Sequence, residues 1–132
     1  MSLMDELFDL AKAAREKAYA PYSKFRVGAA LRTPDGATFA GCNVENAAYP
    51  VGACAEAGAI SAMILAGESQ IAEILVLGSG PHKIAPCGAC RQRIFEFSSR
   101  ATLVHFANEA RAIETHRIDA LLPHAFGPAD LG

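Results

Sequence analysis

The chain has 132 residues, a hydrophobic content of 52% and a formal net charge of -2 at pH 7. This length is enough for one domain with a substantial core, and the charge gives no reason to expect a nucleic-acid partner, because such proteins carry a basic surface. No apolar run approaches the roughly 20 residues that span a bilayer, and the acidic Asp5, Glu6 and Asp9 distinguish the N-terminal segment from a signal peptide.

An amphipathic helix is predicted over residues 4–18, because apolar side chains recur there at intervals of three and four residues. The apolar stripe comprises Leu3, Leu7, Leu10, Ala11 and Ala14. Pro21 is expected to end the helix, because proline cannot continue its hydrogen-bond ladder. We assign this helix only a packing role against the core.

A β-hairpin is predicted next, with strands over residues 27–31 and 38–43. The sequence between them, Thr33-Pro34-Asp35-Gly36, favours a turn because proline presets its φ angle and glycine accepts a positive one. Cys42 lies on the second strand, where we interpret it as a small buried side chain rather than a reactive group.

The rest of the chain alternates between predicted helices and strands. A helix over residues 54–66 is expected to bury Ala59, Ile60, Met63 and Ile64 and to stop at Gly67. A strand is predicted over residues 71–77, and its continuously apolar part, Ile74-Leu75-Val76-Leu77, predicts that it is central and covered on both faces. A third helix opening at Pro86 is followed by strands over residues 101–107 and 113–116 and a short helix over residues 117–122. This order predicts a single three-layer α/β domain over residues 1–132.

Polar side chains gather between the hairpin and the second predicted helix. Asn43, Glu45, Asn46 and Tyr49 fall within seven residues of one another. Asparagine and glutamate after a strand are typical of a solvated turn. A strand end that leads into a helix with metal ligands is also where substrate-orienting groups are commonly found. Both interpretations stay open from these residues alone.

Two short segments carry the strongest chemical signal in the sequence. They are Cys54-Ala55-Glu56 and Pro86-Cys87-Gly88-Ala89-Cys90. Three thiolates can hold a zinc ion and leave one position open, as in catalytic rather than structural zinc sites. In a chain with no secretory signal we expect a cytosolic location, where cysteines stay reduced and are often metal-binding or catalytic.

Glu56 is the predicted acid/base group of such a site. Zinc can bring the pKa of a water molecule to roughly 7, and Glu56 could accept a proton from that water and then deliver protons to a ring nitrogen and to the departing amine. The arrangement suits hydrolytic loss of ammonia from an amidine-like carbon. Both segments are predicted at helix N-termini, which favour thiolates, and Arg91 is expected to add positive charge.

Two alternatives explain the cysteines without catalysis. A zinc ribbon needs four ligands, usually as two paired motifs, and the sequence offers no fourth cysteine or histidine at that spacing. A redox pair at Cys87 and Cys90 would leave Cys54 and Glu56 unexplained. The spacing therefore favours a catalytic zinc site.

Nearly the whole chain resembles the small, homotetrameric type of cytidine deaminase. The matching stretches include residues 20–25, 27–31, 41–47, 49–50, 54–56, 86–92, 121–123 and 126–128. The zinc motif also resembles the general signature of zinc-dependent deaminases, in its form with three cysteines and a non-ligating glutamate. The resemblance implies a three-layer α-β-α fold with a mixed five-stranded sheet. It also implies deamination of cytidine and 2′-deoxycytidine to uridine and 2′-deoxyuridine in pyrimidine salvage.

The resemblance also implies roles for individual residues. Cys54, Cys87 and Cys90 would hold one Zn²⁺ per subunit, and Glu56 would shuttle protons. Asn43 and Glu45 would bind the ribose hydroxyls, Phe25 would stack on the pyrimidine, and the Ala47 backbone would contact the amide edge of the base. Tyr49 and Phe126 would reach a neighbouring subunit's pocket, so that the homotetramer would have composite sites. Neither nucleic acid nor a membrane is an expected partner.

One departure from the family pattern concerns charge. Many members carry arginine directly after the motif glutamate, where it neutralises the thiolates, but this chain has Ala57. The family also includes blasticidin S deaminases, so that an aminopyrimidine of that kind is an alternative substrate, although Asn43, Glu45 and Phe25 favour the plain nucleoside. In the alternative in which the chain is not an enzyme, it is a zinc-stabilised assembly module.

Overall fold

A mixed five-stranded sheet forms the centre of the computed structural model, which describes residues 2–132. The strands are β1 (Gly28–Arg32), β2 (Thr38–Cys42), β3 (Ile71–Leu77), β4 (Ser98–Ala107) and β5 (Ile113–Arg117). They lie in the order β2-β1-β3-β4-β5, with β3 and β4 parallel and the other neighbours antiparallel. The helices are α1 (Leu3–Arg15), α2 (Ala55–Leu65), α3 (Gly88–Glu96) and α4 (Ile118–Leu121), with 3₁₀ turns at Tyr49–Val51 and Pro128–Leu131.

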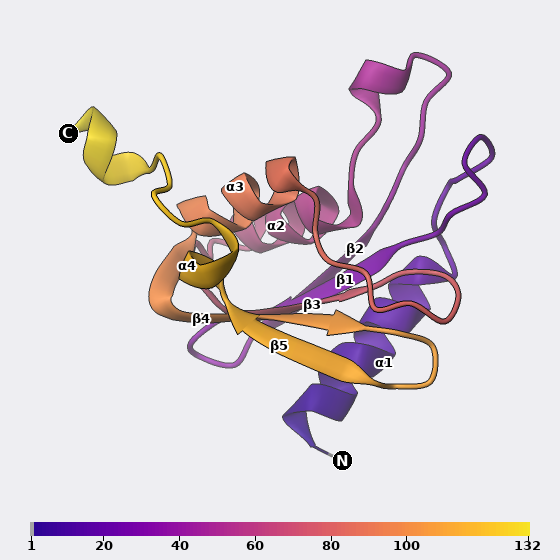
Figure 1. Ribbon diagram of the computed structural model, residues 1–132, viewed down its shortest axis with the longest axis horizontal. Coiled ribbons are helices and arrows are strands. Elements are labelled where there is room, and N and C mark those ends of the chain that lie inside the picture. The colour runs from indigo at the N-terminus through magenta and orange to yellow at the C-terminus, as the bar shows by residue number, and fades with distance from the viewer. Residues whose placement is uncertain (1) are drawn as a thin grey trace.

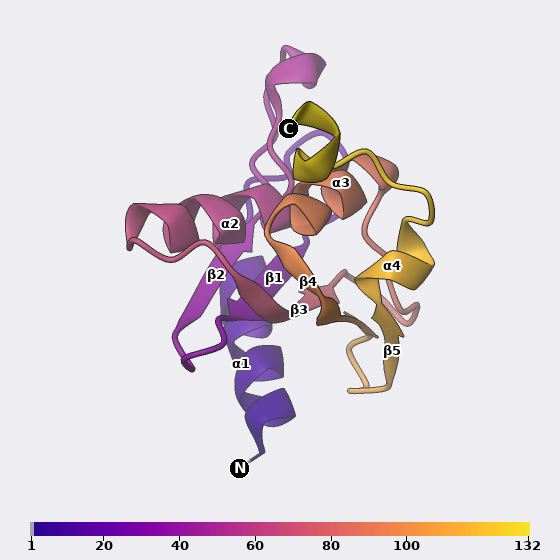
Figure 2. The same cartoon turned by 90° about the vertical axis from the view of Figure 1, so that its left-hand side faces the viewer.

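The helices cover both faces of the sheet, with α1 on one face and α2, α3 and α4 on the other (Figure 1). Figure 2 shows the same three layers from the side. Along β3, Ile74 packs into the apolar cluster under α2, whereas Leu75 and Leu77 pack into the cluster under α1. Successive side chains of a strand point to opposite faces, so the part of a strand that is covered by helices on both faces must be apolar on both, as residues 74–77 of β3 are. The predicted three-layer α-β-α fold and central strand are confirmed.

Helix α1 starts near its predicted position but ends at Arg15 instead of Ala18. Its buried residues are Leu7, Phe8, Ala11 and Arg15, whereas Leu3 and Leu10 of the predicted stripe are exposed. The helix stops early because the following segment pairs with the chain after β2: the Tyr19 N–H donates to the Asn43 carbonyl. This contact between distant segments cannot be predicted from the sequence pattern of one helix.

The two helices near the cysteine motifs begin directly after a cysteine. Cys54 is the N-cap of α2, and Cys87 is the N-cap of α3, which therefore starts at Gly88 rather than at Pro86. Ile64, a predicted core residue of α2, is exposed, and Cys42 is only half-buried rather than buried. Within residues 2–132, no helix is long and apolar enough to cross a bilayer.

Close packing between α2 and β2 sets the position of the first cysteine motif. A Cβ at Gly41 of β2 would lie 2.4 Å from the Ala59 nitrogen and 2.5 Å from the Ala55 carbonyl oxygen. Only glycine therefore allows α2 to approach the strand this closely, because backbone atoms cannot move aside as a flexible side chain can. This contact places the N-terminus of α2, with Cys54 and Glu56, against the carboxyl end of β2.

Candidate metal centre and catalytic site

The sulfur atoms of Cys54, Cys87 and Cys90 converge at the N-termini of α2 and α3. All three Sγ atoms lie within 4.8 Å of one another, and all three cysteines are free of disulfides. Tetrahedral zinc with Zn–S bonds of about 2.3 Å holds its sulfurs roughly 3.8 Å apart, so the thiols need only a small contraction around the ion. Among residues 2–132, no further histidine, cysteine or carboxylate joins this cluster. The donor set fits zinc with one position free for a non-protein ligand.

A short backbone pairing fixes the loop that leads into Cys54. The Val44 N–H donates to the Ala53 carbonyl at 2.9 Å, and the Ala53 N–H donates to the Val44 carbonyl at 2.9 Å. These bonds close the loop between β2 and α2, so that Asn43 and Glu45 at one end lie close to Cys54 at the other. The second motif follows the loop after β3.

The three thiols have different electrostatic surroundings. Burial raises the pKa of the Cys54 thiol and, more strongly, that of Cys90, whose residue is fully buried. The Cys87 thiol is exposed, and hydrogen bonds from the Cys90 and Ala89 backbone N–H groups in the first turn of α3 lower its pKa. A metal ion that binds thiolates offsets the cost of ionising the buried pair.

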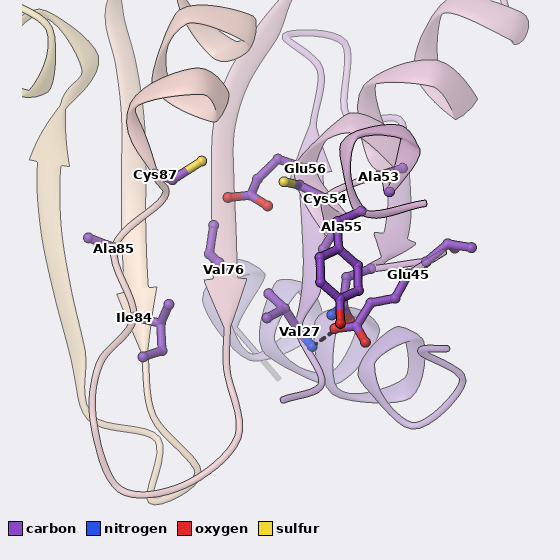
Figure 3. Close-up of a pocket in the computed structure, with 14 residues that line it drawn as sticks. Val27, Glu45, Ala53, Cys54, Ala55, Glu56, Val76, Ile84, Ala85 and Cys87 are labelled. Atoms are coloured by element: carbon purple, nitrogen blue, oxygen red, sulfur yellow. Dashed lines mark hydrogen bonds between the residues drawn. The ribbon is translucent and has the colours of Figure 1, made fainter. Parts of the chain in front are cut away.

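The carboxylate of Glu56 lies between the two cysteine motifs. Figure 3 shows its oxygens directed into the space between Cys54 and Cys87. Only 5% of the residue is exposed, and this burial raises the pKa of its carboxyl group. A buried carboxylate beside a metal site, with no arginine or lysine paired to it within residues 2–132, is well placed to exchange protons with a reacting molecule.

A cavity of about 380 Å³ opens next to Glu56, a size suited to a small organic molecule. Its polar wall includes Asn43 and Glu45, and its apolar wall includes Val27, Val76 and Ile84 (Figure 3). The apolar wall was not predicted from the sequence. Val27, directly before β1, and Ile84, in the loop between β3 and α3, carry no local signal that would place them at the same cavity.

Asn43 and Glu45 are both held by hydrogen bonds to the segment before β1. Asn43 accepts from the Val27 N–H at 2.9 Å and donates to the Phe25 carbonyl at 2.9 Å. Glu45 accepts from the Tyr22 and Ser23 N–H groups at 3.1 Å each and from the Ser23 hydroxyl. The Ser23 contacts lower the pKa of the Glu45 carboxyl. Both side chains are therefore fixed in orientation at the cavity wall, and Glu45 faces it as a carboxylate.

The other residues suggested by the resemblance lie at different places. Tyr49 lines the cavity, is 75% exposed and packs edge-on against Tyr22. The ring of Phe25 lies against Gly78, since a Cβ there would be 2.9 Å from its Cζ. Phe25, Ala47 and Phe126 are not among the cavity-lining residues of the single chain. Phe126 lies where the C-terminal segment is held against α3, since the Gln92 side chain donates to its carbonyl at 2.7 Å. The end of the chain beyond it extends from the body (Figure 1).

The arginine that reaches a thiol is Arg93 and not Arg91. Arg93 Nη1 donates to the Cys90 Sγ at 3.4 Å. The Arg91 guanidinium instead donates to the Pro86 carbonyl at 2.9 Å and the Leu121 carbonyl at 3.2 Å. Adjacent residues point to different sides of a helix, whereas residues three apart are neighbours on its surface. In the sequence, the three-residue spacing between Cys90 and Arg93 therefore indicates the contact with the thiol. The position of Arg91 directly after Cys90 does not.

Known proteins of one family are similar to this chain. A family model described as "Cytidine and deoxycytidylate deaminase zinc-binding region" matches residues 1–106. A cytidine deaminase of Sporosarcina psychrophila is 41% identical over 128 residues, which cover 97% of this chain and 94% of the relative. A cytidine deaminase of Halalkalibacterium halodurans is 40% identical over 118 residues, 89% of each chain. The crystal structure of cytidine deaminase from Burkholderia pseudomallei matches with a TM-score of 0.89 at 47% identity, covering 96% of this chain and 100% of that one.

Proposed function

This chain belongs to the cytidine and deoxycytidylate deaminase family, and we propose that its three cysteines and Glu56 form the centre that deaminates cytidine and 2′-deoxycytidine. Family membership makes the chain a zinc-dependent hydrolase that acts on cytidine. The proposal adds the 2′-deoxy substrate and the role of each residue. The observation that carries it is the buried Glu56 carboxylate between two cysteine motifs, at the end of a cavity large enough for a nucleoside.

Cys54, Cys87 and Cys90 would hold the zinc ion through their thiolates. Zinc bound there supplies a Lewis acid that lowers the pKa of a water molecule toward neutrality. Cys54 and Cys87 line the cavity, whereas Cys90 is fully buried, so the three thiolates would hold the ion at the cavity wall.

Glu56 moves the protons of the reaction. Its carboxylate accepts a proton from the attacking water and delivers it to the ring nitrogen beside the amino-bearing carbon. As the carbon–nitrogen bond breaks, a second proton passes through the same carboxylate to the amino group, which leaves as ammonia. Water supplies both protons and the oxygen, so the products are the uracil nucleoside and ammonia.

The nucleoside would be oriented by groups around the cavity. Glu45 accepts a hydrogen bond from a ribose hydroxyl, and Asn43, at the same wall, contacts the sugar. Phe25 is assigned to stack on the pyrimidine, and the Ala47 backbone to contact the amide edge of the base. The polar wall fixes the sugar, so the amino-bearing carbon is directed toward Cys54 and Glu56.

We propose that the chain forms a homotetramer in which Tyr49 and Phe126 contribute to a neighbour's site. Four large apolar residues support this: Tyr49, Val51, Phe126 and Leu131 are exposed by 75%, 66%, 59% and 81%. They belong to the 3₁₀ turn after β2 and the C-terminal segment, which both project from the body in Figures 1 and 2. Light scattering should give the mass of four chains, and a monomeric, fully active protein would contradict composite sites.

The function is tested by following the ultraviolet absorbance of cytidine with purified protein of measured zinc content. We expect one zinc per chain, conversion of cytidine and 2′-deoxycytidine to their uracil products, and equimolar ammonia. Zinc binding without turnover of either nucleoside would overturn the proposed function. The single domain over residues 1–132 and the cytosolic location stay predictions.

Replacing Glu45 by Gln should reduce the selectivity for sugars that carry hydroxyl groups. A hydrogen bond to a charged group contributes about 1.5–3 kcal/mol, so kcat/KM for cytidine should fall about 10- to 100-fold relative to that for 2′,3′-dideoxycytidine. Because a change in the loop around Ser23 would affect both substrates, it cancels in the ratio of their kcat/KM values. A proportional decrease for both substrates would show that Glu45 only supports the loop.

A further inference from the structure

The proposed zinc centre has an excess of negative charge. Three thiolates around Zn²⁺ give a formal charge of -1, and Glu56 adds a carboxylate only two residues from Cys54. Cys90 is fully buried and Glu56 is 5% exposed, so water screens these charges poorly. Buried charge of one sign is stable only when a cation or hydrogen-bond donors lie beside it.

Arg93 is the cation that the fold places against this centre. Its Nη1 lies 3.4 Å from the Cys90 sulfur, and its charge also acts on Cys54 and Cys87. None of the ion pairs found within residues 2–132 involves Arg93, and its charge also acts on the buried Glu56 carboxyl. Arg91, two residues earlier, is held instead by two backbone carbonyls.

The small side chain of Ala57 leaves room for Arg93 at this surface. Ala57 on α2 and Arg93 on α3 line the same hollow, together with Ser61 and Gln92. Ala57 follows Glu56 directly on α2. The positive charge beside the thiolates is thus provided from α3 in this chain.

We infer that Arg93 is a positioning residue that stabilises the metal-loaded centre through the Cys90 thiolate, a role that rests on the proposed function. A hydrogen bond to a thiolate fixes the direction of the sulfur and lowers its electron density. The guanidinium also offsets the negative charge that the centre has once the metal is bound. Arg93 contacts a ligand and not the substrate, so its effect should appear in metal binding as well as in turnover.

The test compares Arg93→Ala with Arg91→Ala, which removes the same charge from the same helix. Competition with a chromogenic chelator gives the zinc affinity of each purified full-length variant. We expect Arg93→Ala to weaken zinc binding about 10- to 100-fold, as is typical when a group that hydrogen-bonds to a metal ligand is removed. We expect Arg91→Ala to leave the zinc affinity unchanged. Equal affinities for wild type and Arg93→Ala would overturn the inference, as would an equal loss in both variants.

The cobalt-substituted protein supplies a spectroscopic readout of the same contact. Loss of a hydrogen bond raises the electron density of a thiolate, so its charge-transfer band to Co²⁺ should move to longer wavelength in Arg93→Ala and not in Arg91→Ala. Arg93→Lys should keep part of the zinc affinity because it keeps the charge. An unmoved band in Arg93→Ala would contradict the contact with Cys90.

Restoring the charge from the other helix completes the test. Ala57→Arg, added to Arg93→Ala, should recover most of the lost zinc affinity, because the emptied hollow can hold the new guanidinium. A double variant whose zinc affinity is no higher than that of Arg93→Ala would overturn the role of charge. Turnover of cytidine by the wild-type protein separates the two proposals. If zinc affinity depends on Arg93 but cytidine is not turned over, only the proposed function is refuted. If cytidine is turned over but zinc affinity does not depend on Arg93, only this inference is refuted.

Discussion

Replacing Glu56 by Gln should lower kcat for cytidine by about 100- to 10,000-fold while zinc stays bound. An amide has nearly the size and shape of a carboxylate but cannot accept and return a proton at neutral pH. The buried position of Glu56 makes it difficult for another group to replace it, because the cavity wall around it is formed largely by apolar residues and the cysteine ligands. Steady-state kinetics together with zinc analysis of the same preparation measures both outcomes.

A matched control is Glu16→Gln, which makes the same chemical change at an exposed residue at the end of α1. It should keep the wild-type rate. The KM of Glu56→Gln should change far less than kcat, because the lost proton transfer belongs to the transition state and not to substrate binding. Turnover at the wild-type rate by a zinc-loaded Glu56→Gln variant would refute the assignment of Glu56 as the proton carrier.

Replacing Cys87 by Ala should remove most of the zinc, abolish turnover and lower the thermal stability. A ligand that binds only the folded chain stabilises it by about 4 kcal/mol at 1,000 times its Kd, and loss of that amount lowers the Tm of a chain this size by more than about 10 °C. Cys87 joins the loop after β3 to α3, and its thiol links this region to Cys54 on the other helix through the metal. Metal analysis, a cytidine turnover assay and calorimetry measure the three results.

Cys42→Ala is the control for the cysteine change, since Cys42 is half-buried on β2 and outside the thiol cluster. It should keep one zinc per chain and full activity. Removal of zinc from wild type by a chelator should lower its Tm as Cys87→Ala does, and added zinc should restore it. Stoichiometric zinc in Cys87→Ala would exclude Cys87 as a ligand.

The sequence by itself was sufficient to predict the fold class and to select the candidate ligands. The apolar run of β3 required a strand covered on both faces, and the structure confirms that β3 is central between two helical layers. The spacing of Cys87 and Cys90 and the motif around Cys54 indicated three thiols and one carboxylate for a single centre. The fold class is confirmed and the three thiols lie together, because these inferences depend on local periodicity and on the chemistry of a few side chains, which short segments contain.

Tertiary structure decided what depends on contacts between distant segments. Helix α1 ends at Arg15 because Tyr19 pairs with Asn43, and Phe8 rather than Leu10 meets the sheet because packing fixes how the helix is rotated. Arg91 donates to the Leu121 carbonyl at the end of α4, and Arg93 lines a hollow with Ala57 because α2 and α3 meet there. The position and direction of a side chain in space follow from how helices pack on the sheet. That packing is the sum of many weak contacts between residues far apart in the chain, which local sequence patterns do not specify.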